Sequence, residues 1–149
     1  MFDPGQAMTL FGGEELSQFI EQAKWVTVND YEATLLQERT GLAAGELAAR
    51  VEAYVVTRGR EGSVVHARGR SVEIPAVRAA AVVDPTGCGD AYRAGLVYGL
   101  MRGIDWETTG RIASLMGAIK IATVGTQHHR FTLDEFRDRF NETFGYRLD

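Results

Sequence analysis

The chain has 149 residues, of which 45% are hydrophobic and 24% charged, so it can form one globular domain with a buried core. Its formal net charge of −4 gives no support to nucleic-acid binding, and its apolar runs fall short of the ~18 residues that a membrane-spanning helix needs. The only cysteine, Cys88, cannot form an internal disulfide, which agrees with a reducing compartment. We expect a cytoplasmic protein that binds neither nucleic acid nor membranes.

Helix and strand patterns alternate along the chain, which predicts an α/β fold with a mainly parallel sheet flanked by helices. The first helix is marked by apolar residues at i, i+3, i+4 and i+7 spacing, namely Leu16, Phe19, Ile20 and Ala23. Two segments that alternate around Arg68-Gly69-Arg70 predict a hairpin, whose arginines with Arg58 and Arg60 would form a solvated basic face. The elements expected up to this point are helices at 30–41 and 45–51 and strands at 25–28, 54–57, 63–67 and 71–74.

The apolar stretch from Ala91 to Met101 predicts a helix along which small residues recur every four positions. These residues are Gly87, Ala91, Gly95, Gly99 and Gly103. Glycine inside a helix costs about 0.5–1 kcal/mol relative to alanine, so the stripe requires an element packed very close to it. We expect that element to be the sheet.

Two further helices are expected after this one. Asp105 can cap the first, whose core face would consist of Ile112, Leu115, Met116, Ile119 and Ala122. Thr132 and Glu135 form a capping box for the second, with a core stripe of Phe136, Phe140 and Phe144. No internal repeat, low-complexity tract or linker is evident, so residues 1–149 are expected to form a single domain.

The segment Asp84-Pro85-Thr86-Gly87-Cys88-Gly89-Asp90 precedes the glycine-striped helix and is the most informative feature of the sequence. The first amides of a helix lack internal partners and the helix dipole adds positive charge there, so the amides of Gly87, Cys88 and Gly89 are expected to bind phosphate. A carboxylate beside phosphate would repel it, and Asp90 is therefore interpreted as a base that takes a proton from an attacking hydroxyl. The alternative is that Asp90 is an acidic N-cap.

Residues Asp84 to Gly95, which read Asp-Pro-Thr-Gly-Cys-Gly-Asp-Ala-Tyr-Arg-Ala-Gly, closely resemble the carboxy-terminal signature of the ribokinase-like (PfkB) family of carbohydrate and nucleoside kinases. Three further motifs match in the family's order: Asn29-Asp30-Tyr31-Glu32, Thr57-Arg58-Gly59 and Gly125-Thr126-Gln127. Within the family, the sequence of these motifs is most similar to that of bacterial adenosine kinases. The resemblance covers nearly the whole chain but only about the carboxy-terminal half of a family member.

The resemblance implies an ATP-dependent kinase that phosphorylates a hydroxymethyl group of a sugar or nucleoside, with adenosine as the leading substrate. Asp90 would be the catalytic base, and the amides of Gly87, Cys88 and Gly89 would hold the transferring phosphoryl group. Asn29 and Glu32 would organise a hydrated Mg²⁺ ion on the nucleotide phosphates. The alternative for this pair is an ordinary helix start, with asparagine as cap and glutamate in the first turn.

The resemblance also implies nucleotide contacts elsewhere in the chain. Thr57 and Gly59 follow a strand end, where doubly wound sheets bind ligands, and Ser114 is expected to touch the base by its family position. Asp84 and the neighbourhood of Gly125 match positions that supply oxygens to a monovalent cation in some relatives, so K⁺ is a further candidate cofactor.

Cys88 departs from the family, which commonly has a small apolar residue between the two glycines. Its backbone amide is unchanged by the substitution. Because a helix N-terminus can lower the pKa of a thiol, we expect Cys88 to make the site sensitive to oxidation.

Residues 2–6 have the pattern of a strand end and its exit turn, and in the family the amino-terminal half supplies the substrate lid and several strands. We therefore expect this chain to be the nucleotide-side part of a kinase domain, with a sheet edge left for a second copy of the chain or a complementing amino-terminal half to cover. Alone, it is expected to bind ATP weakly, to self-associate and to lack kinase activity.

Other functions remain as alternatives. One is a truncated nucleotide-binding or assembly module without catalysis, and another is a sugar kinase similar to ribokinase or fructokinase. A Rossmann-type dinucleotide binder is disfavoured, because no Gly-x-Gly-x-x-Gly motif follows an early strand.

Overall fold

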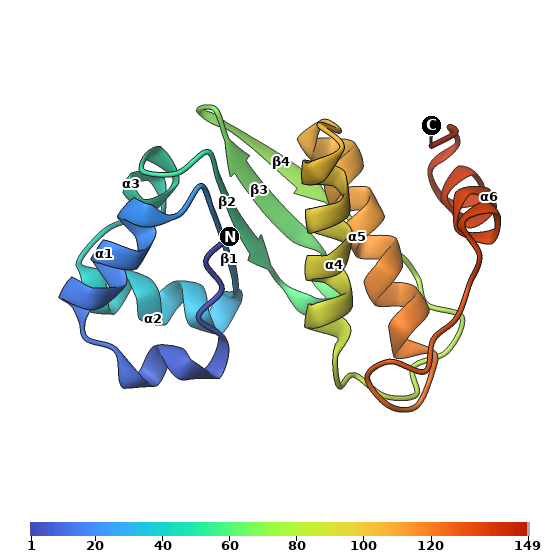
Figure 1. Cartoon of the computed structure of the whole chain (residues 1–149), viewed down its shortest axis with the longest axis horizontal. Coiled ribbons are helices and arrows are strands. Elements are labelled where there is room, and N and C mark those ends of the chain that lie inside the picture. Colours follow the sequence, from blue (N-terminus) through green and yellow to red (C-terminus); the bar gives the residue numbers. More distant parts are fainter. Residues whose placement is uncertain (149) are drawn as a thin grey trace. The chain divides into compact units, whose positions relative to one another are not determined.

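The computed structural model describes residues 1–148, and the chain divides into two compact units, one of residues 1–74 and one from residue 75 onward. The first unit contains the sheet and its helices, and the second contains three longer helices (Figure 1). The α/β class expected from the alternating pattern is confirmed.

Apart from the short helices η1 and η2, which were not expected, the first unit follows the predicted order of elements, with boundaries within one or two residues of those expected for most of them. Its helices are η1 (Gly5–Leu10), α1 (Gly13–Gln22), α2 (Asp30–Thr40), α3 (Ala44–Ala49) and η2 (Gly59–Glu61). Its strands are β1 (Trp25–Asn29), β2 (Ala53–Thr57), β3 (Ser63–Ala67) and β4 (Arg70–Ile74).

The sheet has the order β1-β2-β3-β4 and is mixed. β1 and β2 are parallel because α2 and α3 carry the chain back between them, and Phe2 adds one parallel bridge to Val26 of β1. β2–β3 and β3–β4 are antiparallel, since their connections are too short for a crossover. One of the three strand pairs described here is thus parallel and two are antiparallel, and the β3–β4 pair is the hairpin that the sequence predicted.

Local sequence signals explain where the elements of the first unit begin and end. Leu16 and Ile20 of α1 are buried as predicted, and Phe19 packs against the rings of Phe2 and Phe11 with centroid distances of 5.5 and 5.1 Å. α2 ends at Gly41, whose left-handed φ of 69° suits glycine. The buried core of this unit consists of Met8, Leu16, Ile20, Val26, Val28, Ala33, Leu36, Leu47 and Tyr54.

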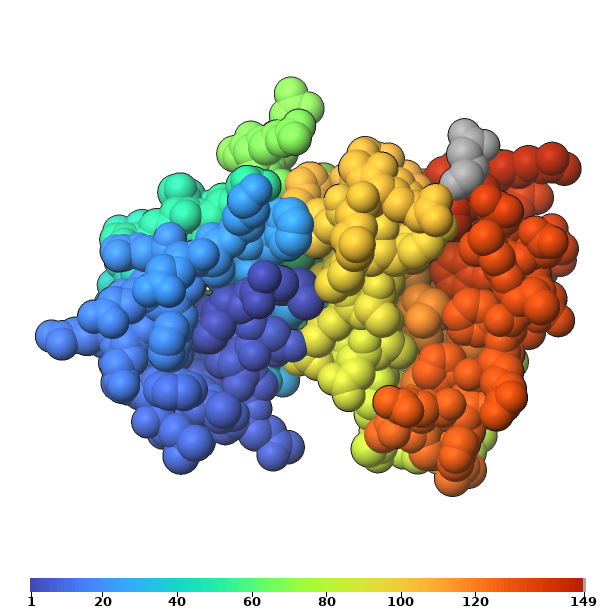
Figure 2. Space-filling view, in the orientation of Figure 1, coloured from blue at the N-terminus to red at the C-terminus, as the bar shows by residue number. Residues whose placement is uncertain are grey.

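The β3–β4 turn confirms the predicted hairpin. Arg68 and Gly69 form a two-residue loop with φ values of 52° and 71°, the left-handed pair that type I′ turns require. The tip of this hairpin stands out from the surface (green in Figure 2). Arg68 and Arg70 are exposed and Arg58 pairs with Glu73, which agrees with a solvated basic face.

The second unit contains α4 (Cys88–Met101), α5 (Trp106–Ile121) and α6 (Leu133–Phe144). Both predicted caps form: Asp105 accepts a hydrogen bond from the Thr108 amide, and Thr132 forms a reciprocal capping box with Glu135. The buried core is Ile112, Leu115, Ile119, Phe136, Phe140 and Leu148. Among the helices of residues 1–148, none combines the length and apolar character needed to cross a membrane.

The small-residue stripe of α4 packs against α5 within the second unit. A Cβ built on Gly95 would lie 2.5 Å from the Cα of Ala113, and one on Gly99 would lie 2.4 Å from the Thr109 hydroxyl oxygen. The close neighbour predicted from the stripe therefore exists, but it is α5, where the sequence analysis expected the sheet. Gly103 has a different role, because its amide and that of Ile104 bond back to α4 as a Schellman cap.

We predict that Gly95→Ala destabilises the protein by about 1–3 kcal/mol, because the new methyl group meets the backbone of α5 and the helices must separate. Gly45→Ala in α3 is the matched control, since a Cβ there meets nothing within 4 Å. The control should be neutral or slightly stabilising. Urea denaturation of both variants measures the difference, and equal stability of the two would contradict the packing argument.

Candidate functional site

The glycine-rich segment forms the start of α4. Gly87 is the N-cap residue and has a left-handed backbone, with φ 82° and ψ 4°, and no side chain caps this helix. The helix begins at Cys88, so Asp90 is its third residue and not its cap. The acidic N-cap alternative is therefore wrong.

The amides at the start of α4 differ in whether they already donate a hydrogen bond within the protein. The amide of Cys88 already donates to the carbonyl of Pro85 at 3.1 Å, which closes the turn before the helix. Within residues 1–148, no hydrogen bond engages the amides of Gly87 and Gly89. Two amides with the positive end of a 14-residue helix behind them form a site that an anion can occupy.

The two glycines have different steric constraints. A Cβ on Gly87 would lie 3.1 to 3.2 Å from three atoms of Thr126, so Gly87 is required by its own fold as well as by its positive φ. A Cβ on Gly89 would meet only the flexible end of Arg93, with Nη1 at 2.8 Å. Gly89 is consequently the better position at which to test anion binding without disturbing the fold.

Asp90 points its carboxylate toward solvent, with 79% of the side chain exposed. Its Oδ1 lies 3.3 Å from Nη1 of Arg93, one turn further along α4. The guanidinium offsets the negative charge at the helix start and fixes the direction of the carboxylate. The sequence analysis missed Arg93 as a partner, although its i, i+3 spacing from Asp90 is a local signal.

Unlike Asp90, Asp84 has backbone amides bound to both of its carboxylate oxygens. Its Oδ1 accepts the Thr86 amide at 2.9 Å and its Oδ2 accepts the Gly125 amide at 2.8 Å. These backbone hydrogen bonds, from Thr86 first and then Gly125, lower the pKa of Asp84 from 3.8 to about 2. The carboxylate thereby joins the loop before α4 to the loop after α5.

Lys120 makes a second connection between the same loops. Its side chain is fully buried, and its Nζ donates to the Asp84 carbonyl at 2.7 Å and to the Thr123 carbonyl at 3.3 Å. The amides of Val83 and Asp84 also donate to the Ile121 carbonyl, at 2.9 and 3.1 Å. The sequence analysis did not select Lys120, although it is one of only two lysines and lies on the apolar face of its helix.

Cys88 contradicts the expectation of a reactive thiol. Burial is the largest influence on the pKa of this thiol and raises it. The positive charge of Lys120 comes second and lowers the pKa, and the negative charge of Asp84 comes last and raises it. The expected lowering by the helix N-terminus is therefore wrong, and with it the ground for expecting oxidation sensitivity.

In the first unit, Asn29 and Glu32 form a reciprocal capping box at the start of α2. Asn29 Oδ1 accepts the Glu32 amide at 2.8 Å, and Glu32 Oε2 accepts the Asn29 amide at 2.8 Å. The ordinary helix-start interpretation is thus realised, and Glu32 is buried. No group of three His, Cys, Asp or Glu side chains within residues 1–148 is arranged to hold a metal.

The other predicted nucleotide contacts have structural partners or open surroundings. Thr57 pairs with Asn29 across the parallel strand ends, and its hydroxyl lies 3.4 Å from the Val28 carbonyl. Gly59 has a φ of 55° and space beside its Cα. The Ser114 hydroxyl donates to the Pro75 carbonyl at 2.9 Å and accepts the Val77 amide at 3.0 Å. It therefore ties α5 to residues 75–77, which precede α4 in the chain.

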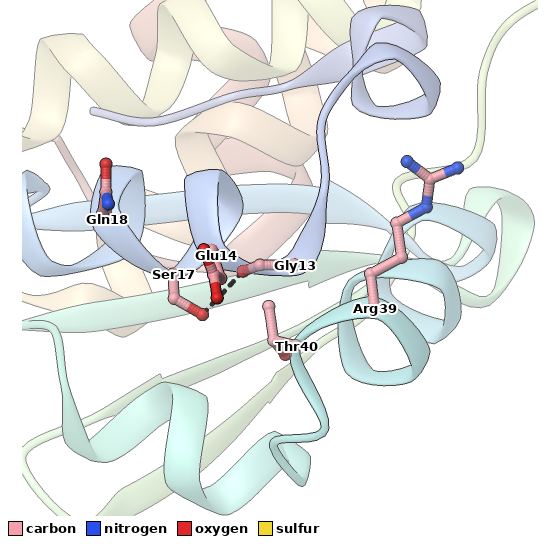
Figure 3. A pocket seen from close by; sticks show the side chains of 6 residues that line it. All are labelled: Gly13, Glu14, Ser17, Gln18, Arg39 and Thr40. Atoms are coloured by element: carbon pink, nitrogen blue, oxygen red, sulfur yellow. Dashed lines mark hydrogen bonds between the residues drawn. The ribbon is translucent and has the colours of Figure 1, made fainter.

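A surface hollow of about 540 Å³ lies between α1 and α2 and contains none of the predicted site residues (Figure 3). Its Ser17 hydroxyl donates to the Gly13 carbonyl at 2.8 Å. The guanidinium of Arg39 is directed at the carbonyls of Met8 and Phe11. The Ser17 bond thus lies within α1, and Arg39 ties η1 and the residue after it to α2.

Residues 6–132 match the pfkB family of carbohydrate kinases. The chain belongs to this family. The match includes both the Asn29 capping box and the α4 start, and it confirms the resemblance inferred from the signature residues.

Nucleoside kinases of two organisms resemble the chain along most of its length. A nucleoside kinase of Methanocaldococcus jannaschii is 32% identical over 141 residues, which are 95% of this chain and 47% of the relative. The structure of the Burkholderia thailandensis nucleoside kinase in complex with inosine has a TM-score of 0.98 and 52% identity, covering 99% of this chain and 48% of that one. The M. jannaschii structure has a TM-score of 0.91.

The chain spans about half the length of the nucleoside kinases of M. jannaschii and Methanothermobacter thermautotrophicus, covering 47% of each. These relatives are named as nucleoside kinases, and others as a sugar kinase and a ribokinase. The expected resemblance is therefore supported for nucleoside kinases as a group, without adenosine being singled out.

We predict that part of the stability depends on the ionised Asp84 carboxylate. Because its pKa is lowered from 3.8 to about 2 in the fold, this contribution is complete above about pH 4 and is lost as the pH falls toward 2. Between pH 4 and pH 2 the melting temperature should fall less for Asp84→Asn than for the parent. At pH 7 the variant should have a lower melting temperature than the parent. Asp138→Asn, an exposed carboxylate of α6, should keep the parent's drop. Identical drops for the parent and Asp84→Asn would show that Asp84 is not the group responsible.

Proposed function

We propose that this chain provides the phosphate-side machinery of an ATP-dependent nucleoside kinase. The observation that carries the proposal is the start of α4, where unengaged glycine amides lie beside an exposed carboxylate on the same helical turn. An anion site alone would only bind phosphate. The adjacent carboxylate adds a group that can take a proton, and phosphoryl transfer to a hydroxyl needs both.

The proposed reaction uses Asp90 as the general base. Its carboxylate accepts the proton of a nucleoside hydroxymethyl group while the hydroxyl oxygen forms a bond to the terminal phosphorus of ATP, and the bond from that phosphorus to ADP breaks. Arg93, 3.3 Å from Asp90 Oδ1, keeps the carboxylate in a fixed direction. High exposure in the structure agrees with this role, because a base must reach a hydroxyl that comes from outside the chain.

The amides of Gly87 and Gly89 would offset the charge on the oxygens of the transferring phosphoryl group. The amide of Cys88 would contribute only by sharing its bond to the Pro85 carbonyl, which lies 3.1 Å away. Asn29 and Glu32 would hold water molecules around Mg²⁺, which neutralises phosphate charge when it is bound. Thr57, Gly59 and Ser114 remain proposed nucleotide contacts.

A nucleoside is favoured as the acceptor by the relatives. The Burkholderia protein, 52% and 51% identical to this chain in its two complexes, was solved with inosine and with ADP-inosine. Adenosine has the same ribose hydroxymethyl group and belongs to the proposed substrate class. A sugar acceptor is the runner-up, because a ribokinase is 28% identical over 126 residues.

The function is tested by joining this chain to the part of the Burkholderia kinase that it does not match. Phosphorylation of inosine, adenosine and ribose is followed by ADP release, with the unjoined chain assayed beside it. We expect transfer to the nucleosides by the joined protein. Transfer to ribose alone would favour the sugar kinase, and ATP binding without any transfer would favour a non-catalytic module.

We predict that Asp90→Asn in the joined protein lowers turnover by about 10²–10⁴-fold, which is the usual contribution of a general base. ATP affinity should be nearly unchanged, because the variant removes a negative charge that does not bind phosphate. Asp138→Asn, on the exposed side of α6, is the matched control and should keep the parent rate. Turnover near the parent rate in Asp90→Asn would refute the assignment of the base.

We further predict that Gly89→Ala weakens ATP binding by about tenfold, which corresponds to ~1.4 kcal/mol. The methyl group narrows the approach of phosphate to the amides, and its nearest neighbour within the protein is a side-chain end and not backbone, with Arg93 Nη1 at 2.8 Å. Gly45→Ala should leave the affinity unchanged. Calorimetric titration with ATP measures both variants, and a parent-like affinity in Gly89→Ala would exclude the α4 start as the phosphate site.

A further inference from the structure

The K⁺ site expected at Asp84 and Gly125 can be tested against the oxygens that are present there. A bound K⁺ ion needs several oxygens to replace its water shell. Both carboxylate oxygens of Asp84 already accept backbone amides, from Thr86 at 2.9 Å and from Gly125 at 2.8 Å. The carbonyl oxygens of Asp84 and Thr123 accept the Lys120 ammonium at 2.7 and 3.3 Å. These residues do not fit a resident monovalent cation.

The Lys120 ammonium lies among backbone oxygens, as a bound cation would. Its Nζ is fully buried and bonds to backbone carbonyls of two loops that are 39 residues apart in sequence, at Asp84 and Thr123. Thr123 is held in place by two bonds to the Lys120 carbonyl, from its amide and its hydroxyl, each 3.0 Å long. A second positive ion among these oxygens would be repelled by the ammonium.

We propose that the Lys120 ammonium replaces a bound monovalent cation and fixes the α4 start without K⁺. Lys120 is a positioning residue that acts through the loop before Gly87. Its bond to the Asp84 carbonyl, together with the Asp84–Gly125 bond, sets the loop from which α4 begins and keeps Gly87 against Thr126. A buried amine is retained here because the carbonyls around it would otherwise lack a partner.

Cation dependence of stability tests this proposal and requires no kinase activity, so its failure would leave the proposed function standing. The parent chain, Lys120→Ala and Lys24→Ala are melted in KCl and in choline chloride at equal ionic strength. Lys24 is the matched control, since it is the other lysine, is 72% exposed and lies 3.8 Å from Glu52 at the surface. The parent and the control should melt within about 1 °C in the two salts.

Lys120→Ala should melt at least about 5 °C below the parent in choline chloride, a shift typical of a lost buried interaction. It should recover part of that loss in KCl, because K⁺ can enter the space that the amine has left. A purely structural role would give the loss without the recovery. A parent chain stabilised by KCl, a Lys120→Ala variant as stable as the parent, or a variant that melts equally in both salts would each overturn the proposal.

A measurement on the unmodified sequence covers the case in which Lys120→Ala does not fold. The chain has two lysines, so acetylation of the native protein by an amine-reactive ester can be followed at each of them by mass spectrometry. Lys120 should react at least ten times more slowly than Lys24, because its amine is buried and hydrogen-bonded. Equal rates would show that the amine is free and would overturn the proposal.

Discussion

The candidate site depends on the polar links between the loop before α4 and the loop after α5. Asp84 takes part in most of them: its carboxylate accepts Thr86 and Gly125, its carbonyl accepts Lys120, and its amide reaches Ile121. A glycine-rich loop has high conformational entropy, so it presents its amides in one direction only when other contacts hold it. These links supply that restraint, and the position of Gly87 against Thr126 follows from it.

Two carboxylates six residues apart therefore have separate roles. Asp84 is saturated with backbone hydrogen bonds, which keep it ionised and make it part of the framework. Asp90 is 79% exposed and its Oδ1 lies 3.3 Å from Arg93 Nη1, so its carboxylate lies at the surface, where a hydroxyl from outside the chain can reach it. The same side chain is a structural group at Asp84 and the proposed base at Asp90, and the two differ in the backbone hydrogen bonds that they accept.

The sequence was sufficient for features that local signals determine. The capping boxes at Thr132, the cap at Asp105 and the Arg68-Gly69 turn all form where short-range patterns predicted them. It was insufficient where the partner is distant in sequence. The small-residue stripe of α4 predicted that another element packs close to it, but only the tertiary structure shows that this element is α5. Lys120 was missed for the same reason, because its partners become visible only when the loops come together.

Cys88 and the Asn29–Glu32 pair show how a local rule can be valid and still not decide the outcome. A helix N-terminus does favour a thiolate, yet burial of the Cys88 thiol outweighs this effect, and the pKa of Cys88 rises. Asn29 and Glu32 do start a helix, and this role engages one oxygen of each side chain. The proposed Mg²⁺ role of the pair therefore has to coexist with the capping box, in which the Asn29 amide holds Oε2 of the Glu32 carboxylate in place.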